Sequence, residues 1–148
     1  MDMDLRFDCI GVDWQLVSDT LKRVGMAYHK PDKQRKAFEN SYAVVFVYQG
    51  GKQGGGHSGQ MIGFGRAISD GAYQAAIYDV AVIPEYQRQG VGTEIMKQIL
   101  VRLSSCNVIL YAAPGKEGFY RTLGLRKMKT AMALFRRAEI MQEKGFTD

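Results

Sequence analysis

The sequence VAVIPEYQRQGVGT, from Val80 to Thr93, joins an apolar run that stops at Pro84, a polar turn and the start of an amphipathic helix. The first N–H groups of a helix have no partner within it, and the helix dipole adds roughly half a positive charge there. Gly90 and Gly92 carry no Cβ that would keep a ligand from these groups, and Arg88 adds a positive charge. The stretch therefore predicts an anion site, with phosphate as the natural ligand.

Two common phosphate motifs fit the sequence less well. The dinucleotide fingerprint needs a third glycine where Ile95 stands, and no acidic residue that follows a strand lies about twenty residues further on. A P-loop needs Lys-Ser/Thr at a helix start, whereas the glycine-rich stretch 50–59 precedes a strand-like segment. We expect this stretch to be a hairpin loop between strands 42–48 and 60–68, and we expect its His57 to be inert.

Apolar residues recur elsewhere in the chain with the periods of strands and helices. Asp13 suits the cap of the first helix, and the near-continuous apolar run 107–112 suits a strand covered on both faces. The order β-α-α-β-β-β-α-β-α-β-β predicts one α/β domain over residues 1–148 with a mixed sheet. The expected strands are 5–10, 42–48, 60–68, 75–83, 107–112, 125–129 and 131–135, and the expected helices are 14–24, 31–38, 91–103, 116–123 and 136–144.

Composition narrows the class of protein. A chain of 148 residues with 46% hydrophobic residues fits a single domain that needs no disulfide or metal staple. Cys9 and Cys106 form no C-x-x-C pair and there are two histidines, which excludes a zinc finger and a disulfide framework. The apolar runs fall short of the ~20 residues that span a bilayer, and the first residues, MDMDLR, lack the apolar region of a signal peptide. We expect a reduced, soluble, cytoplasmic protein without a metal or a membrane partner.

The net charge of +5 favours anionic partners: nucleic acid, an acidic protein surface or a cofactor that carries phosphate. The basic run from Lys30 to Lys36 is expected to be a solvated helix face. It has no interleaved aromatic platform, and the chain carries no recognised nucleic-acid-binding motif. Nucleic acid is therefore not expected as a partner.

Two motifs carry a resemblance to a known family. The segment QRQGVG, from Gln87 to Gly92, resembles the Gln/Arg-x-x-Gly-x-Gly/Ala pyrophosphate loop of the GCN5-related N-acetyltransferase (GNAT) superfamily, and Ala81-Val82-x-Pro84 is similar to the end of that family's fourth strand. Downstream, GFYRTLGL from Gly118 to Leu125 resembles its Phe-Tyr-x-x-x-Gly-Phe signature. The resemblance covers residues 75–135 by motif and the whole chain by order of elements. It implies the acyl-CoA N-acyltransferase fold, a mostly antiparallel sheet with a central splay, flanked by helices.

The resemblance also implies a co-substrate, acetyl-CoA, and an amine acceptor that attacks it directly in a ternary complex. Backbone groups of Ala81 and Val82 would pair with the pantetheine arm, and the N–H near Val82 would stabilise the developing oxyanion. Gln87 would shape the loop whose amides hold the pyrophosphate, and Phe119 would pack against the cofactor. The implied cofactor-binding residues are Ala81, Val82, Gln87, Arg88, Gln89, Gly90, Val91, Gly92, Thr93 and Phe119.

For catalysis the resemblance implies that Tyr120 places its hydroxyl near the sulfur, as the general acid for the thiolate of CoA. The amine must be neutral when it attacks. Asp79, on an apolar strand just before the expected splay, is a candidate base because burial would raise its pKa. Deprotonation through water is the alternative, and so is a purely structural hydrogen bond from Asp79. Tyr28 and His29 lie where the family usually forms its acceptor pocket.

Two positions depart from the family pattern: Leu125 replaces the usual Phe, and Ala113 stands where many members carry an Asn that contacts the cofactor. A non-catalytic acyl-CoA-binding or regulatory module of the same fold is the alternative function. No residue pattern selects the acceptor, which can be a polyamine or aminoglycoside, an amino acid or a protein amine. The excess of Lys and Arg disfavours a polycation, unless Glu39, Asp70 and Asp79 cluster in the cleft. Family members are often dimers through their last strands, so a homodimer is a further expectation.

Overall fold

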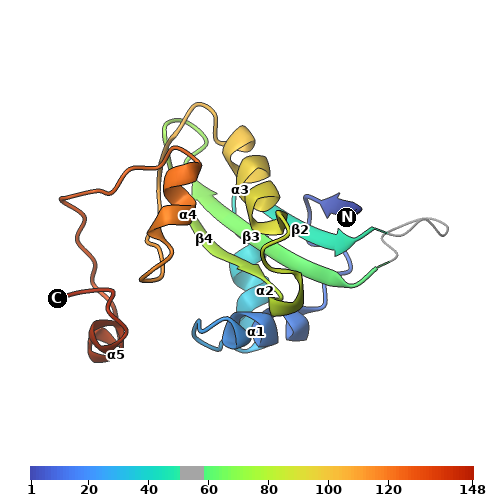
Figure 1. The fold of residues 1–148 in the computed structure, drawn as a ribbon, viewed down its shortest axis with the longest axis horizontal. Coiled ribbons are helices and arrows are strands. Elements are labelled where there is room, and N and C mark those ends of the chain that lie inside the picture. The colour runs from blue at the N-terminus through green and yellow to red at the C-terminus, as the bar shows by residue number, and fades with distance from the viewer. Residues whose placement is uncertain (51–58) are drawn as a thin grey trace. The chain divides into compact units, whose positions relative to one another are not determined.

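The computed structural model describes residues 1–50 and 59–148, and divides the chain into two compact units, Met1–Leu110 and Tyr111–Asp148 (Figure 1). The interior of the expected glycine-rich loop, with His57, lies outside the described residues. No helix among the described residues is long and apolar enough to cross a membrane. In the same part of the chain, no three His, Cys, Asp or Glu side chains gather as a metal site would require.

The first unit is built on a five-stranded sheet with the strand order β1-β2-β3-β4-β5. Neighbours pair antiparallel from β1 to β4, and β5 pairs parallel to β4. Six consecutive residues of β2 are buried, as a strand covered on both faces requires. This mixed, mostly antiparallel sheet confirms the predicted fold class. The strands are β1 (Met3–Arg6), β2 (Ala43–Gln49), β3 (Met61–Ser69), β4 (Gln74–Val82) and β5 (Asn107–Ile109).

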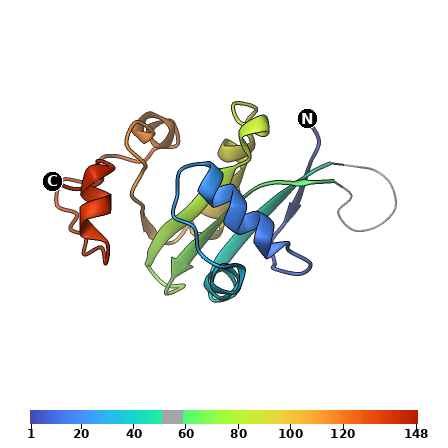
Figure 2. The same ribbon diagram turned by 90° about the horizontal axis from the view of Figure 1, so that it is seen from below.

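Three helices cover the two faces of this sheet: α1 (Trp14–Arg23) and α2 (Pro31–Glu39) lie on one face and α3 (Val91–Arg102) on the other (Figure 2). Asp13 caps α1 as predicted, because its carboxylate accepts a 3.1 Å hydrogen bond from the N–H of Leu16. On the α3 face, a Cβ built on Gly65 would lie 2.9 Å from Ile95. Glycine at position 65 therefore lets α3 pack directly on the sheet.

An aromatic core fills the space between the sheet and helices α1 and α2. Phe38 on α2 packs against Phe46 on β2 and Phe64 on β3, with ring centroids 5.4 and 5.8 Å apart. Trp14 on α1 completes the cluster, 5.7 Å from Phe38. These side chains fix α1 and α2 against one face of β2 and β3.

A bulge interrupts β4. Arg66 pairs with Tyr78 and Phe64 with Ala81, so both Asp79 and Val80 lie opposite the single residue Gly65. Asp79 has a φ of 57°, in the left-handed region that side-chain-bearing residues rarely adopt. The extra residue reverses the alternation of side chains along the strand.

The sheet also opens next to this bulge. The pairing of β4 with β5 covers Gln74–Ala76 and ends where Ala76 meets Ile109. On its other edge, β4 stays paired with β3 as far as Val82. Among the described residues, the last part of β4 therefore has a strand on one side and none on the other, as the expected splay requires.

The second unit holds two short helices, α4 (Glu117–Thr122) and α5 (Ala138–Glu143), both within predicted helical ranges. The ring of Tyr111 contacts the rings of Phe135 and Phe146, at 5.4 and 5.7 Å between centroids. These contacts join the beginning of the unit to its end.

The predicted strands 125–129 and 131–135 are wrong, because neither segment forms a strand, and the predicted strand 107–112 ends at Ile109. A strand is stable when its backbone groups pair with a neighbour and its apolar face is covered. Neither condition holds for 131–135, since Met132 is 94% exposed and Leu134 is 77% exposed. Alternating apolar residues led to the prediction, but pairing partners decide the structure.

Candidate functional site

The connection from β4 to α3 is a short loop held by its own side chains. It starts with η1, the 3-10 helix Pro84–Tyr86. The side-chain amide of Gln87 donates a 3.0 Å hydrogen bond to the carbonyl of Val82, and that of Gln89 donates a 3.2 Å bond to the carbonyl of Glu85. Arg23 on α1 forms a 2.6 Å ion pair with Glu85. The loop is thus tied both to the strand before it and to a neighbouring helix.

The start of α3 is uncapped. Gly90 is the cap residue and has a φ of 88°, and among the described residues no side chain donates to or accepts from the cap. A Cβ built on Gly90 would have no atom within 4 Å, so the space in front of the helix is open. Arg88 has a φ of 63° and is exposed. Among the described residues, the start of α3 thus has no side-chain cap, and an exposed Arg88 stands two residues before Gly90 in the chain, a combination that suits a phosphate.

The open edge of β4 leads to this helix start. The N–H of Ile83 donates a 2.9 Å hydrogen bond to the carbonyl of Ile62 on β3. Because consecutive backbone amides in a strand point to opposite edges, the N–H of Val82 points to the edge where no strand of the described residues pairs with β4. The carbonyl of Val82 also faces away from β3, since it accepts the bond from Gln87. The N–H of Val82 is therefore available to an extended ligand, whereas its carbonyl is held by Gln87.

Asp79, the candidate base, lies at the bulge in an ion pair. Its carboxylate accepts a 2.7 Å hydrogen bond from the Nε of Arg66 on β3, and the two side chains are 26% and 15% exposed. The guanidinium of Arg66 also lies 5.7 Å from the ring centroid of Phe38 and 5.4 Å from that of Tyr78, and contacts the hydroxyl of Ser41 at 3.3 Å. Sequence reasoning missed Arg66, although a lone charge within an apolar strand was a usable signal.

Tyr28 and His29 lie in the connection between α1 and α2, as predicted. The hydroxyl of Ser18, fully buried on α1, donates a 2.7 Å hydrogen bond to the carbonyl of His29. Tyr28 is 45% exposed, and the ammonium of Lys22 lies 5.9 Å from its ring centroid. This loop is anchored to α1 and presents the ring of Tyr28 to solvent beside the ammonium of Lys22 on α1.

Phe119 and Tyr120 lie side by side on α4 of the second unit. Their ring centroids are 5.0 Å apart and the ring planes meet at 71°. Burial raises the pKa of the Tyr120 hydroxyl above its usual value near 10. The phenol therefore keeps its proton at neutral pH, which is the form that a general acid needs.

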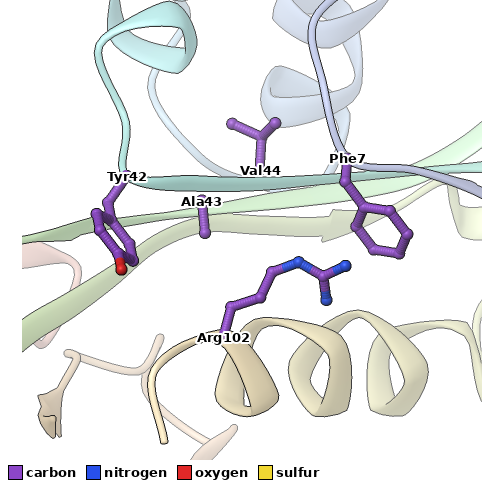
Figure 3. Close-up of a pocket in the computed structure, with 5 residues that line it drawn as sticks. All are labelled: Phe7, Tyr42, Ala43, Val44 and Arg102. Atoms are coloured by element: carbon purple, nitrogen blue, oxygen red, sulfur yellow. The ribbon is translucent and has the colours of Figure 1, made fainter. Parts of the chain in front are cut away.

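A hollow of about 250 Å³ lies at the other end of α3 (Figure 3). Phe7, Tyr42, Ala43, Val44 and Arg102 line it. The guanidinium of Arg102 lies 3.7 Å from the ring centroid of Phe7. Because α3 rises about 1.5 Å per residue, roughly 18 Å of helix separates this hollow from Gly90. The hollow is thus separate from the predicted phosphate site.

Comparison with known proteins identifies the relatives of this chain. Residues 14–125 match the family described as "Acetyltransferase (GNAT) family". The chain is 31% identical over 144 residues to serotonin N-acetyltransferase 2, chloroplastic, of Oryza sativa, and the match covers 93% of the chain and 70% of that protein. It is 41% identical over 124 residues to GCN5-related N-acetyltransferase 1, chloroplastic, of Arabidopsis thaliana, over 81% of the chain and 59% of the relative.

Solved structures show the same fold. A Staphylococcus aureus protein, described as a probable acetyltransferase, superposes with a TM-score of 0.77 at 22% identity, over 92% of this chain and 99% of that one. The ribosomal-protein-S18-alanine N-acetyltransferase of Escherichia coli gives a TM-score of 0.68 at 16% identity, over 86% of this chain and 80% of that one. By contrast, the chain spans 57% to 59% of two of the curated relatives that it matches.

Proposed function

The chain belongs to the GNAT acetyltransferase family and is an acyltransferase, and on this premise we propose that it moves an acetyl group from acetyl-CoA to a primary amine by direct attack in a ternary complex. The observation that carries the proposal is the uncapped start of α3 beside the open edge of β4. The two features fit the two parts of one ligand, a diphosphate and an extended amide-bearing arm.

The residues of the first unit fit acetyl-CoA as follows. The N–H groups at the start of α3, with Arg88, would hold the pyrophosphate. The hydrogen bond from Gln87 to the carbonyl of Val82 holds the loop against the end of β4. The N–H of Val82 lies at the open edge, where the pantetheine arm would add as another strand would, whereas the backbone groups of Ala81 face β3 and do not fit the role implied for them. When bound, acetyl-CoA supplies a thioester that a neutral amine can attack. The N–H of Val82 would then stabilise the negative charge that develops on the carbonyl oxygen.

Tyr120 is the proposed general acid. As the carbon–nitrogen bond forms and the carbon–sulfur bond breaks, the departing thiolate would take the phenolic proton of Tyr120, and the proton that the acylated nitrogen sheds would return to the phenolate through water. The raised pKa of this phenol supports the role, since the hydroxyl stays protonated across the physiological range. Phe119 would pack against the cofactor beside it.

Two routes remain for the proton that the amine must lose. Asp79 can take it, or it can pass to water. An alkylammonium has a pKa near 10.4, so only a small fraction of the amine is neutral at pH 7, whichever group takes the proton. Asp79 as the base stays a prediction, and its carboxylate is paired with Arg66.

The acceptor is proposed to be a single amine on a small molecule or a protein. The three acidic residues named above as a possible polycation site are engaged locally: Glu39 with Arg35 at 3.0 Å, Asp79 with Arg66, and Asp70 with N–H groups of its own turn. This arrangement supports an acceptor with few positive charges. The rice relative is named for serotonin, an aromatic monoamine, which fits an acceptor loop that presents Tyr28.

The test is release of free thiol from acetyl-CoA over a panel of amines: serotonin, tryptamine, spermidine, free lysine and a lysine-containing peptide. Turnover with at least one monoamine supports the proposal. If CoA binds in calorimetry but no amine on a widened panel is acetylated, the protein is instead a non-catalytic acyl-CoA-binding module. If CoA does not bind, both functions fail. Light scattering of the same sample tests the expected homodimer, and the cytoplasmic location stays an expectation.

A further inference from the structure

We propose that Arg66 and Asp79 form a positioning pair: they hold the bulge in β4, and the bulge turns the N–H of Val82 toward the thioester. On this inference, which rests on the proposed function, Asp79 acts through the backbone and is not the base. Four observations carry it: the register of the bulge, the conformation of Asp79, the surroundings of Arg66 and the atom that Asp79 uses.

The register shows what the bulge does. With the bulge, Ile83 lies opposite Ile62 and donates its N–H to β3. The N–H of Val82 therefore points to the open edge. Without the extra residue, every later position of β4 would move by one. Val82 would then lie opposite Ile62 and turn its N–H toward β3. The proposed oxyanion donor therefore exists at the open edge because β4 is bulged.

The conformation of Asp79 shows that the bulge needs support. A left-handed φ of 57° is unfavourable for a residue with a side chain, although Asp tolerates it better than most. Such a conformation persists when the surrounding structure fixes it. The contact that does so is the 2.7 Å bond from Arg66, which faces Asp79 from the neighbouring strand.

Arg66 is itself held in place. Its guanidinium lies near the rings of Phe38 and Tyr78 and contacts the hydroxyl of Ser41. At 15% exposure it has lost most of its water, so a carboxylate partner matters more here than at the surface. The side chain thereby joins α2, the entry to β2 and the bulge in one rigid group.

The same bond argues against Asp79 as the base. A general base must reach the proton of the amine with a free oxygen lone pair in the right place. Here Oδ2 of Asp79 accepts the hydrogen bond from Nε of Arg66, which leaves Oδ1 as the oxygen that could take a proton. Using this carboxylate as a base would exchange a partly buried ion pair for an unpaired Arg66. Water is then the carrier of the proton.

The test compares Arg66→Gln, Asp79→Asn and the double variant by steady-state kinetics with the best amine. If the pair positions the bulge, both single variants lower kcat about tenfold to 100-fold, and the double variant is no worse than either single one. Arg66→Lys should recover part of kcat, because it keeps the charge. Arg35→Gln, which breaks an exposed ion pair with Glu39 on α2, is the matched control and should stay within twofold of wild type.

The alternative outcomes are distinct. If Asp79→Asn loses activity while Arg66→Gln keeps it, Asp79 is the base and the inference fails. It also fails if both variants keep wild-type kcat, or if Asp79→Asn removes the acidic limb of the pH–rate profile while Arg66→Gln leaves it. Should Arg66→Gln not fold by circular dichroism, Arg66→Lys and Asp79→Asn decide. A wild-type protein that binds no CoA would refute the proposed function instead.

Discussion

The side-chain amide of Gln87 donates a 3.0 Å hydrogen bond to the backbone carbonyl of Val82. This bond closes the turn between β4 and α3, and so sets the distance from the open strand edge to the uncapped helix start. One polar side chain in the loop thus couples the two surfaces that a single extended ligand would contact.

Replacing Gln87 with Ala should weaken acetyl-CoA binding without unfolding the protein. The lost hydrogen bond is worth about 1 kcal/mol, so we expect the dissociation constant to rise about fivefold. Calorimetric titration with CoA measures it. Asn40→Ala is the control, because Asn40 makes the same kind of bond, 2.7 Å to the carbonyl of Lys36, on α2. Equal affinity of the Gln87→Ala variant and wild type would contradict the role of the bond.

Gly90→Ala should reduce both affinity and stability. The φ of 88° costs a residue with a Cβ about 1–2 kcal/mol, and the new Cβ stands in the open space where a phosphate would approach. We expect CoA affinity to fall at least tenfold, and the melting temperature to fall by a few degrees.

Gly25→Ala separates these two effects. Gly25 follows α1 with a φ of 91° and has no atom within 4 Å of a built Cβ, so its backbone strain matches that of Gly90. The variant should lose similar stability and keep wild-type CoA affinity. If Gly90→Ala lowers affinity no more than Gly25→Ala does, the start of α3 does not bind phosphate.

The loop and helices of the first unit were predictable because their signals are local. Gly90 precedes an amphipathic run that marks the start of α3, and Asp13 precedes the run that marks α1, so both signals lie in neighbouring residues alone. The bulge at Asp79 was not predictable. It depends on which residues of β3 and β4 pair, and on the contact with Arg66, 13 positions away in the chain.

The same distinction explains the error at 125–135. The alternation of apolar residues there is a strand signal, but a strand also needs a partner, and the sequence does not say whether one is present. In the structure, Met132 and Leu134 are exposed and the segment stays irregular. The motif that contains Tyr120 was nevertheless predicted in the right element, because α4 closes its hydrogen bonds within the segment.

Tyr120→Phe should lower kcat about 100-fold and leave CoA affinity unchanged, because it removes the proton donor and keeps the ring. The raised pKa means that the folded protein binds this proton more tightly than the unfolded chain does. The contribution of this proton to the free energy of unfolding is therefore present below about pH 10 and is lost as the pH rises further. Tyr73→Phe, at a residue that is 64% exposed, is the control. A Tyr120→Phe variant with wild-type kcat would remove Tyr120 as the acid.

Cys9 should be nearly inert to thiol reagents in the native protein. Burial, chiefly, and the nearby Glu39 and Asp8 carboxylates raise the pKa of its thiol to about 11. The reactive thiolate is then about a thousandth of the total at pH 8, against roughly a quarter for a free thiol with a pKa near 8.5. In the Cys106→Ser variant, which isolates Cys9, we expect modification by a disulfide reagent to be more than 100-fold slower than after denaturation. Fast native labelling of this variant would show that Cys9 is not packed against the aromatic core. Slow labelling would also mean that Cys9 adds little background to an assay of thiol released from CoA.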